Sequence, residues 1–111
     1  MRSMDRHVDI PEVDPQEAKA RIEAGAYHVD VREHDEIRAK RIPGGTPLPL
    51  SSFLEKYEAA LPSGQPIVVS CRSGARSGQV TAFLIERGYD AVNLAGGIIA
   101  WENDGLPVEQ G

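Results

Sequence analysis

The feature that most constrains this chain is a short, wholly apolar run, Ile67-Val68-Val69. β-Branched residues in succession predict a strand, and the absence of alternating polar residues predicts that both faces of this strand are buried. Strands of this kind occur in parallel sheets that carry helices on both sides. The rest of the chain has to supply those helices and the neighbouring strands.

Helical and extended segments do alternate along the chain. Capping boxes predict helix starts at Asp14, with Glu17, and at Ser52, with Glu55. An apolar stripe predicts a third helix, which ends at Gly88. Further segments are predicted as strands over residues 27–31, 46–48 and 91–94, and as a short helix over residues 98–103. The alternation predicts an α/β fold with a central parallel sheet of about five strands flanked by helices.

The length and charge of the chain narrow its class. The 111 residues suit one domain, which we expect over residues 8–111, after a flexible N-terminus at residues 1–7. The net charge of -5 argues against general binding to nucleic acid or to anionic membranes. Neither a signal peptide nor an apolar run of membrane-spanning length is recognisable, so we expect a cytoplasmic protein.

The segment from Ser70 to Ser77 is the candidate for chemistry. It places the single cysteine, Cys71, between the apolar strand and a helix, at the sheet edge where open parallel sheets bind ligands. Gly74 permits a tight turn that aims several backbone N–H groups at one point. Arg72, Arg76 and the helix N-terminus add positive charge. This setting favours a thiolate, with a pKa below the value of about 8.5 of a free cysteine.

Other interpretations of Cys71 are weaker. A lone cysteine is most often a small buried side chain, but such a residue needs neither the glycine nor the arginines nor the strand-to-helix junction. Without a second cysteine no Cys-x-x-Cys redox centre exists. His7, His28 and His34 have no motif relation to Cys71, which argues against a cysteine protease. No Cys/His cluster predicts a metal site, and we expect no cofactor.

Four motifs resemble those of the rhodanese family, specifically its single-domain members, over about residues 8–108. The segment from Cys71 to Ser77 resembles the active-site loop Cys-Arg-x-Gly-x-Arg-Ser/Thr. The other three are Asp30-Val31-Arg32-Glu33, Ile42-Pro43-Gly44-Gly45, and Leu94-Ala95-Gly96-Gly97 followed by Ala100-Trp101. One departure is Arg41, where the family usually has a histidine.

The resemblance implies a three-layer rhodanese-like fold and a sulfurtransferase. Cys71 would take a sulfane sulfur from thiosulfate or a similar anionic donor, hold it as a persulfide and pass it to cyanide or a thiol. A thioredoxin-like protein is one candidate for that thiol. The N–H groups of the loop would cradle the outer sulfur, from residues Arg72, Ser73, Gly74, Ala75 and Arg76.

The resemblance also suggests roles for single side chains around this loop. Arg72 would attract the donor, and Arg76 would close the loop, anchored against an acidic group such as Asp30. Asp30 and Arg32 are expected to support the loop as scaffold. Ser77 would either bond the bound anion or only cap its helix. Trp101 is expected to be a core aromatic residue, and Gly96 and Gly97 to be turn residues.

Two rival functions remain. A phosphatase or arsenate reductase also uses a thiolate and an arginine in an anion loop, but tyrosine phosphatases have five residues between the two, whereas four separate Cys71 from Arg76. A non-enzymatic docking or sulfur-carrier module shares the fold, although docking modules commonly lack the cysteine. The sequence leaves open whether the chain acts as a free enzyme or as a carrier for a protein partner.

Overall fold

A central parallel sheet organises the chain, as predicted. The computed structural model describes residues 10–111, so the expected flexible segment at residues 1–7 lies outside the described part. The sheet has five strands in the order β1-β6-β5-β2-β4, and every pairing is parallel. The strands are β1 (Glu12–Val13), β2 (Tyr27–Asp30), β4 (Thr46–Pro47), β5 (Ile67–Ser70) and β6 (Ala91–Leu94). β5, the apolar run of the sequence, is the middle strand.

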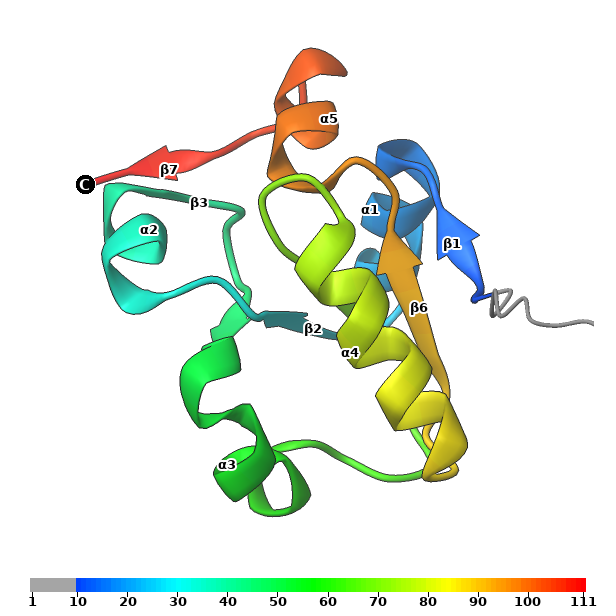
Figure 1. Cartoon of the computed structure of the whole chain (residues 1–111). Helices are drawn as coiled ribbons and strands as arrows, with labels where there is room; N and C mark the ends of the chain where they lie inside the picture. Colours follow the sequence, from blue (N-terminus) through cyan, green and yellow to red (C-terminus); the bar gives the residue numbers. More distant parts are fainter. Residues whose placement is uncertain (1–9) are drawn as a thin grey trace, which may run out of the picture.

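Helices cover both faces of this sheet and complete three layers (Figure 1). α1 (Pro15–Glu23) and α5 (Gly97–Asn103) pack on one face. The other face is covered by α3 (Phe53–Ala60) and α4 (Ala75–Glu86). The short helices α2 (His34–Ala39) and η1 (Leu50–Ser52) follow β2 and β4 respectively, and β3 (Lys40–Arg41) forms an antiparallel pair with β7 (Glu109–Gln110).

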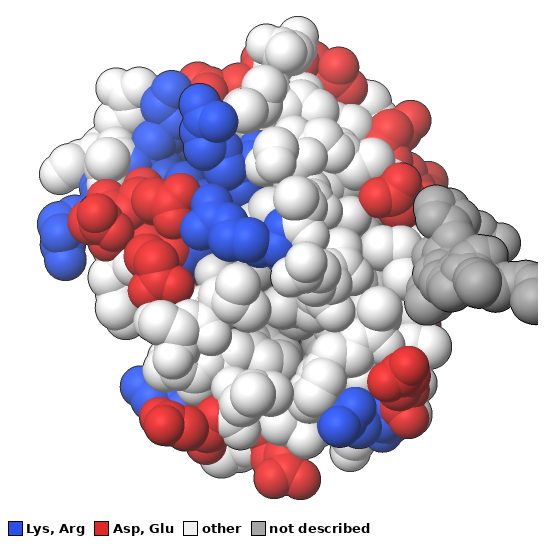
Figure 2. Space-filling model, viewed as in Figure 1, with Lys and Arg blue, Asp and Glu red and all other residues white. Residues whose placement is uncertain are grey.

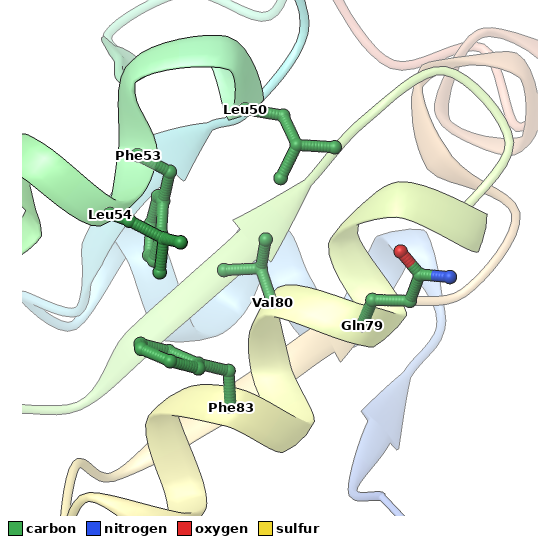
Figure 3. A pocket seen from close by; sticks show the side chains of 6 residues that line it. All are labelled: Leu50, Phe53, Leu54, Gln79, Val80 and Phe83. Atoms are coloured by element: carbon green, nitrogen blue, oxygen red, sulfur yellow. The ribbon is translucent and has the colours of Figure 1, made fainter.

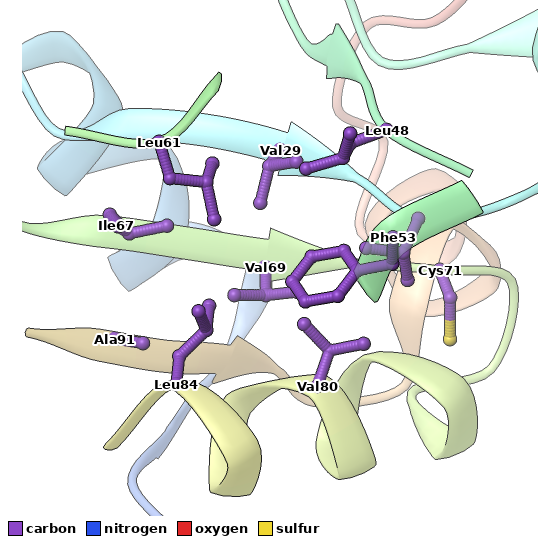
Figure 4. Close-up of a cluster of buried hydrophobic side chains, with 11 residues drawn as sticks. Val29, Leu48, Phe53, Leu61, Ile67, Val69, Cys71, Val80, Leu84 and Ala91 are labelled. Atoms are coloured by element: carbon purple, nitrogen blue, oxygen red, sulfur yellow. The ribbon is translucent and has the colours of Figure 1, made fainter. Parts of the chain in front are cut away.

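The side chains of β5 alternate between two apolar cores. Ile67 and Val69 point into the core beneath α3 and α4, which is drawn in Figure 4. Val68 points the opposite way, into the core beneath α1 and α5. Trp101 lies in this second core and is 3% exposed, which confirms it as a core aromatic residue. Burial on both faces explains why this strand is apolar without alternation.

The predicted helix starts are only partly right. Asp14 caps α1, because its carboxylate accepts a hydrogen bond of 2.8 Å from the backbone N–H of Glu17. The side chain of Glu17 pairs with Arg21 at 2.8 Å rather than completing the box. Ser52 makes no side-chain cap to α3, because its hydroxyl donates to the carbonyl of Pro49 at 3.4 Å. The turn of η1 precedes α3 and takes the place of a cap.

Within residues 10–111, each helix is too short or too polar to cross a membrane.

Candidate active site

Cys71 lies where the sequence predicted it, at the junction between β5 and α4. It directly follows Ser70, the last residue of β5, at the carboxyl edge of the sheet. Its side chain is 1% exposed, and it packs beside Val80 and Phe53 at the end of the apolar core. Figure 4 shows the sulfur at the loop end of this cluster, beside the first turn of α4. Cys71 is therefore buried at a strand-to-helix loop, not within the centre of the core.

Three donors converge on the sulfur of Cys71. The backbone N–H of Gly74 donates to Sγ at 3.1 Å. Ser77 donates twice, from its backbone N–H at 3.4 Å and from its hydroxyl at 3.2 Å. Gly74 has a φ of 99° and is the N-cap residue of α4, which confirms the predicted left-handed turn. The loop thus folds back so that donors surround one atom, as in backbone anion nests.

These donors decide the ionisation of the thiol. Burial alone raises the pKa of Cys71, but the hydroxyl of Ser77 and the backbone N–H groups of Ser77, Gly74 and Ser73 outweigh burial, and the net pKa is lowered. The direction agrees with the sequence-based expectation, and hydrogen bonds from the loop and from Ser77 are its main cause. Ser77 is the third residue of α4 and not its cap, so its hydroxyl is free to serve the sulfur.

Arg76 is anchored against an acidic group, but this group is not Asp30, the example that the sequence analysis gave. Its guanidinium makes two bonds to the carboxylate of Glu36 in α2, at 2.8 and 2.9 Å, rather than to Asp30. These bonds, against the opposing effect of burial, lower the pKa of Glu36 to about 2 and raise that of Arg76. Glu36 also accepts the backbone N–H of Glu33 at 3.0 Å in a capping box of α2. Arg76 therefore ties the start of α4 to α2.

Asp30 and Arg32 form their own buried ion pair, at 2.8 Å, at the end of β2. Arg32 also donates to the backbone carbonyl of Lys40 at 2.9 Å, which connects β2 with β3. Asp30 lies opposite Ser70 in the sheet, one residue before Cys71. The pair thus holds the sheet edge beside the loop, and the contacts of both side chains are those of scaffold residues.

The start of α5 packs against the loop and holds its backbone, a role that sequence analysis missed. The N–H groups of Ile98 and Ile99 donate to the carbonyls of Cys71 and Arg72, at 3.0 and 3.2 Å. Gly97 makes this approach possible, because a Cβ atom there would lie 2.3 Å from the carbonyl oxygen of Arg72. Gly97 is therefore more than a turn residue, because its missing side chain lets the backbone of Cys71 and Arg72 lie against it.

Asn93 is a second support that the sequence did not reveal. This residue of β6 is 1% exposed, and its amide donates to the carbonyl of Gly74 at 3.1 Å and to the carboxylate of Glu12 at 2.9 Å. A buried amide beside the loop was the available signal, since strand interiors seldom carry asparagine. Asn93 thereby holds the carbonyl of Gly74, the same residue whose N–H donates to Sγ of Cys71.

A polar cavity of about 270 Å³ opens beside the loop. Charged side chains from α2, β3 and α5 gather here with the loop, and Figure 2 shows blue and red atoms side by side over this region. Most of these charges are paired: Arg32 with Asp30, Lys40 with Glu102, and Glu36 with Arg76. Within residues 10–111, Arg72 is the lining cation without an ion-pair partner. The cavity is lined by Arg32, Glu36, Lys40, Arg72, Ile98, Ile99 and Glu102.

Known proteins resemble this chain in sequence and in fold. The model of the rhodanese-like domain family matches residues 14–104. A sulfurtransferase of Allochromatium vinosum is 43% identical over 81 residues, which is 72% of this chain and 75% of that protein. The thiosulfate sulfurtransferase GlpE of Haemophilus influenzae is 34% identical, with 92% of this chain and 97% of that protein covered. The crystal structure of a rhodanese-related protein from Thermoplasma volcanium superposes with a TM-score of 0.83 at 29% identity, covering 89% of this chain and 97% of that one. The chain therefore belongs to the rhodanese-like domain family.

Proposed function

We propose that this chain is a thiosulfate sulfurtransferase in which Cys71 carries sulfur as a persulfide. The observation that carries the proposal is the convergence of the Gly74 N–H and the Ser77 N–H and hydroxyl on Sγ of Cys71. Donors fixed in advance around Sγ stabilise the Cys71 thiolate, which attacks the donor in the first half-reaction and leaves the persulfide in the second. The names of the relatives from A. vinosum and H. influenzae support sulfur transfer, and the latter name supports thiosulfate.

The first half-reaction loads the sulfur. The Cys71 thiolate attacks the outer sulfur of thiosulfate, a bond forms between the two sulfur atoms, and the bond between the sulfurs of thiosulfate breaks. Sulfite leaves with the electron pair of that bond. Arg72, a cation that lines the polar cavity and has no ion-pair partner among residues 10–111, would attract the dianionic donor and stabilise the departing sulfite. The other arginine of the loop, Arg76, is neutralised by Glu36 and would serve as an anchor.

The second half-reaction discharges the sulfur. Cyanide or a thiolate attacks the outer sulfur of the persulfide and returns Cys71 as a thiolate. The chain contains one cysteine, so no internal thiol can release the sulfur by forming a disulfide. The acceptor has to come from outside, and a thioredoxin-like protein is one such acceptor. Because donor product leaves before acceptor binds, the kinetics should be ping-pong.

A direct comparison of substrates tests this function against a phosphatase. The purified protein is assayed with thiosulfate and cyanide, with initial rates measured over a grid of both concentrations, and separately with an aryl phosphate. We expect parallel double-reciprocal lines for sulfur transfer and little phosphate release, since the loop is one residue shorter than a tyrosine phosphatase loop. Rapid phosphate release without thiocyanate formation would contradict the proposal and favour a phosphatase.

A further inference from the structure

A second hollow lies on the other side of the active-site loop, between α4 and the segment formed by η1 and α3. Its volume is about 210 Å³, and it shares no lining residue with the polar cavity. Figure 3 shows Leu50, Phe53 and Leu54 facing Val80 and Phe83 across this hollow. We call it the apolar groove, and it is lined by Leu50, Phe53, Leu54, Gln79, Val80 and Phe83.

The apolar groove adjoins the nucleophile. Phe53 and Val80 belong to the same buried cluster as Cys71, and Leu50 and Phe83 pack against that cluster. Val80 lies one helical turn beyond Ser77, whose hydroxyl bonds Sγ. A ligand in the groove would therefore lie along the middle turns of α4, next to the turn that carries Ser77, and a sulfur atom at its inner end would face the active-site loop.

The shape of the groove is fixed by aromatic packing. The ring of Phe53 stacks on Tyr57 with centroids 5.4 Å apart and meets Phe83 edge to face at 6.0 Å. The guanidinium of Arg87 lies 3.7 Å from the centroid of Phe83. Leu54 at the rim is 71% exposed, the largest value among the exposed large apolar side chains of the described residues. An apolar ligand would remove this side chain from water and find its aromatic neighbours already placed.

The composition of the groove selects its ligand. It contains no charged lining residue, and Figure 2 shows white atoms where α4 meets α3. A sulfonate or sulfite would lose its hydration here and meet no cation among the lining residues, whereas Arg72 lines the polar cavity, so we expect the anionic donor to bind there. A cavity of about 150 Å³ lined by Leu, Ile and Phe is large enough for benzene. The groove therefore has room for one phenyl ring or a short alkyl chain.

We propose that the apolar groove binds the body of a small thiol acceptor that carries an aryl or alkyl group next to its sulfur. This inference rests on the proposed sulfurtransferase function and names the acceptor class. The acceptor thiolate, after giving its proton to solvent, attacks the outer sulfur of the Cys71 persulfide. A bond forms between these two sulfurs, the bond between Sγ and the outer sulfur breaks, and Cys71 leaves as the thiolate. The product is an organic persulfide.

The test measures discharge separately from loading. The protein is loaded with thiosulfate, freed of excess donor, and mixed with benzyl mercaptan or 2-mercaptoethanol, with the rates corrected to equal thiolate concentration. We expect benzyl mercaptan to discharge the persulfide at least about tenfold faster, the scale on which small apolar groups are discriminated by apolar pockets. Leu54→Glu should lower the ratio of the benzyl rate to the 2-mercaptoethanol rate towards one, because both thiolates meet the new charge but only the benzyl group loses its apolar contact. The matched control is Ile85→Glu, an exposed apolar residue of α4 outside the groove.

The outcomes separate this inference from the proposed function. If loading is normal, three results would contradict the inference alone. The first is an equal discharge rate with both thiols, and the second is a benzyl preference that Leu54→Glu does not diminish. The third is that, of these thiols and reduced thioredoxin tested as an additional acceptor, only thioredoxin accelerates discharge. If thiosulfate fails to load the protein, the proposed function is wrong, and the groove is tested on the unloaded thiol. Benzyl methanethiosulfonate should then label the free thiol of Cys71 faster than methyl methanethiosulfonate does, and Leu54→Glu should abolish this difference in rate. Equal labelling would contradict the inference.

Discussion

The hydroxyl of Ser77 donates a hydrogen bond of 3.2 Å to Sγ of Cys71 from inside the first turn of α4. Burial by itself raises the pKa of this thiol, so a lowered pKa depends on such donors. Ser77 is fully buried and the backbone on both sides of it is helical, which leaves its side chain little freedom to turn away.

Removing that hydroxyl should therefore make the thiol less acidic. Ser77→Ala should move the midpoint of alkylation rate against pH upwards, because the anion loses one donor while its burial remains. The wild-type midpoint should lie below the free-cysteine value of about 8.5. Ser73→Ala is the matched control, since Ser73 contributes through its backbone N–H, which alanine keeps. An unchanged midpoint in Ser77→Ala would show that the hydroxyl does not stabilise the thiolate.

Arg72 should act on the donor half-reaction. Arg72→Ala should raise the KM for thiosulfate by about fivefold, as expected for loss of one exposed charge contact, and the effect should shrink as ionic strength rises. The control is Arg38→Ala, a cation of α2 that does not line the polar cavity. Identical thiosulfate kinetics in Arg72→Ala and the control would remove Arg72 from donor binding.

Gly97 should tolerate no side chain. It has a φ of 61°, and a Cβ atom would approach the backbone of Arg72 and Cys71 to between 2.3 and 2.6 Å. Gly97→Ala should destabilise the fold by about 1–3 kcal/mol and displace the loop, with loss of sulfur loading. Gly105→Ala provides the control, because its φ is 78° and nothing lies near its Cβ position. Equal unfolding free energies and equal loading in both variants would contradict this close approach.

His28 should make stability depend on pH. Its ring is buried and bonds the hydroxyl of Ser70 at 2.8 Å. Burial, partly opposed by Asp30, lowers its pKa from 6.5 to about 4. Below pH 6.5 His28 is protonated in the unfolded chain but stays neutral in the folded chain. The free energy of unfolding therefore falls as the pH drops from about 6.5 to about 4. The full effect is at most about 3 kcal/mol.

Denaturant unfolding at pH 7.5 and 4.5 measures this effect. The loss of unfolding free energy between the two values should be smaller in His28→Gln, whose amide has no titrating group. The same loss in both proteins would show that the histidine is not held neutral by the fold.

The elements that the sequence predicted well are those specified by neighbouring residues. β5 and the loop after it are specified by residues that are adjacent in the sequence. These are an apolar run, then Cys71 and Gly74, and then the start of an amphipathic helix. Two of the short elements, α2 and β1, carry too little pattern to be recognised. α2 buries one side chain, Ile37, and therefore shows no apolar stripe, and β1 is two residues long.

The partners of the loop depended on distant contacts. Glu36 lies 40 residues from Arg76, and nothing in the spacing distinguishes it from the other acidic residues of the chain. Asp30 was the expected partner of Arg76 because it lies at the end of a strand. Its carboxylate instead forms an ion pair with Arg32, two residues away. Asn93 and Gly97 reach the loop only because β6 pairs with β5, which places their turn beside it.

Mass spectrometry of the intact protein tests the central claim most directly. Incubated with thiosulfate and freed of excess donor, the wild-type chain should gain the mass of one sulfur atom and lose it again when cyanide is added. Cys71→Ser should gain nothing, because a serine hydroxyl is not ionised near neutral pH and cannot take up the sulfur. A wild-type mass that stays unchanged, or an equal gain in Cys71→Ser, would contradict a persulfide on Cys71.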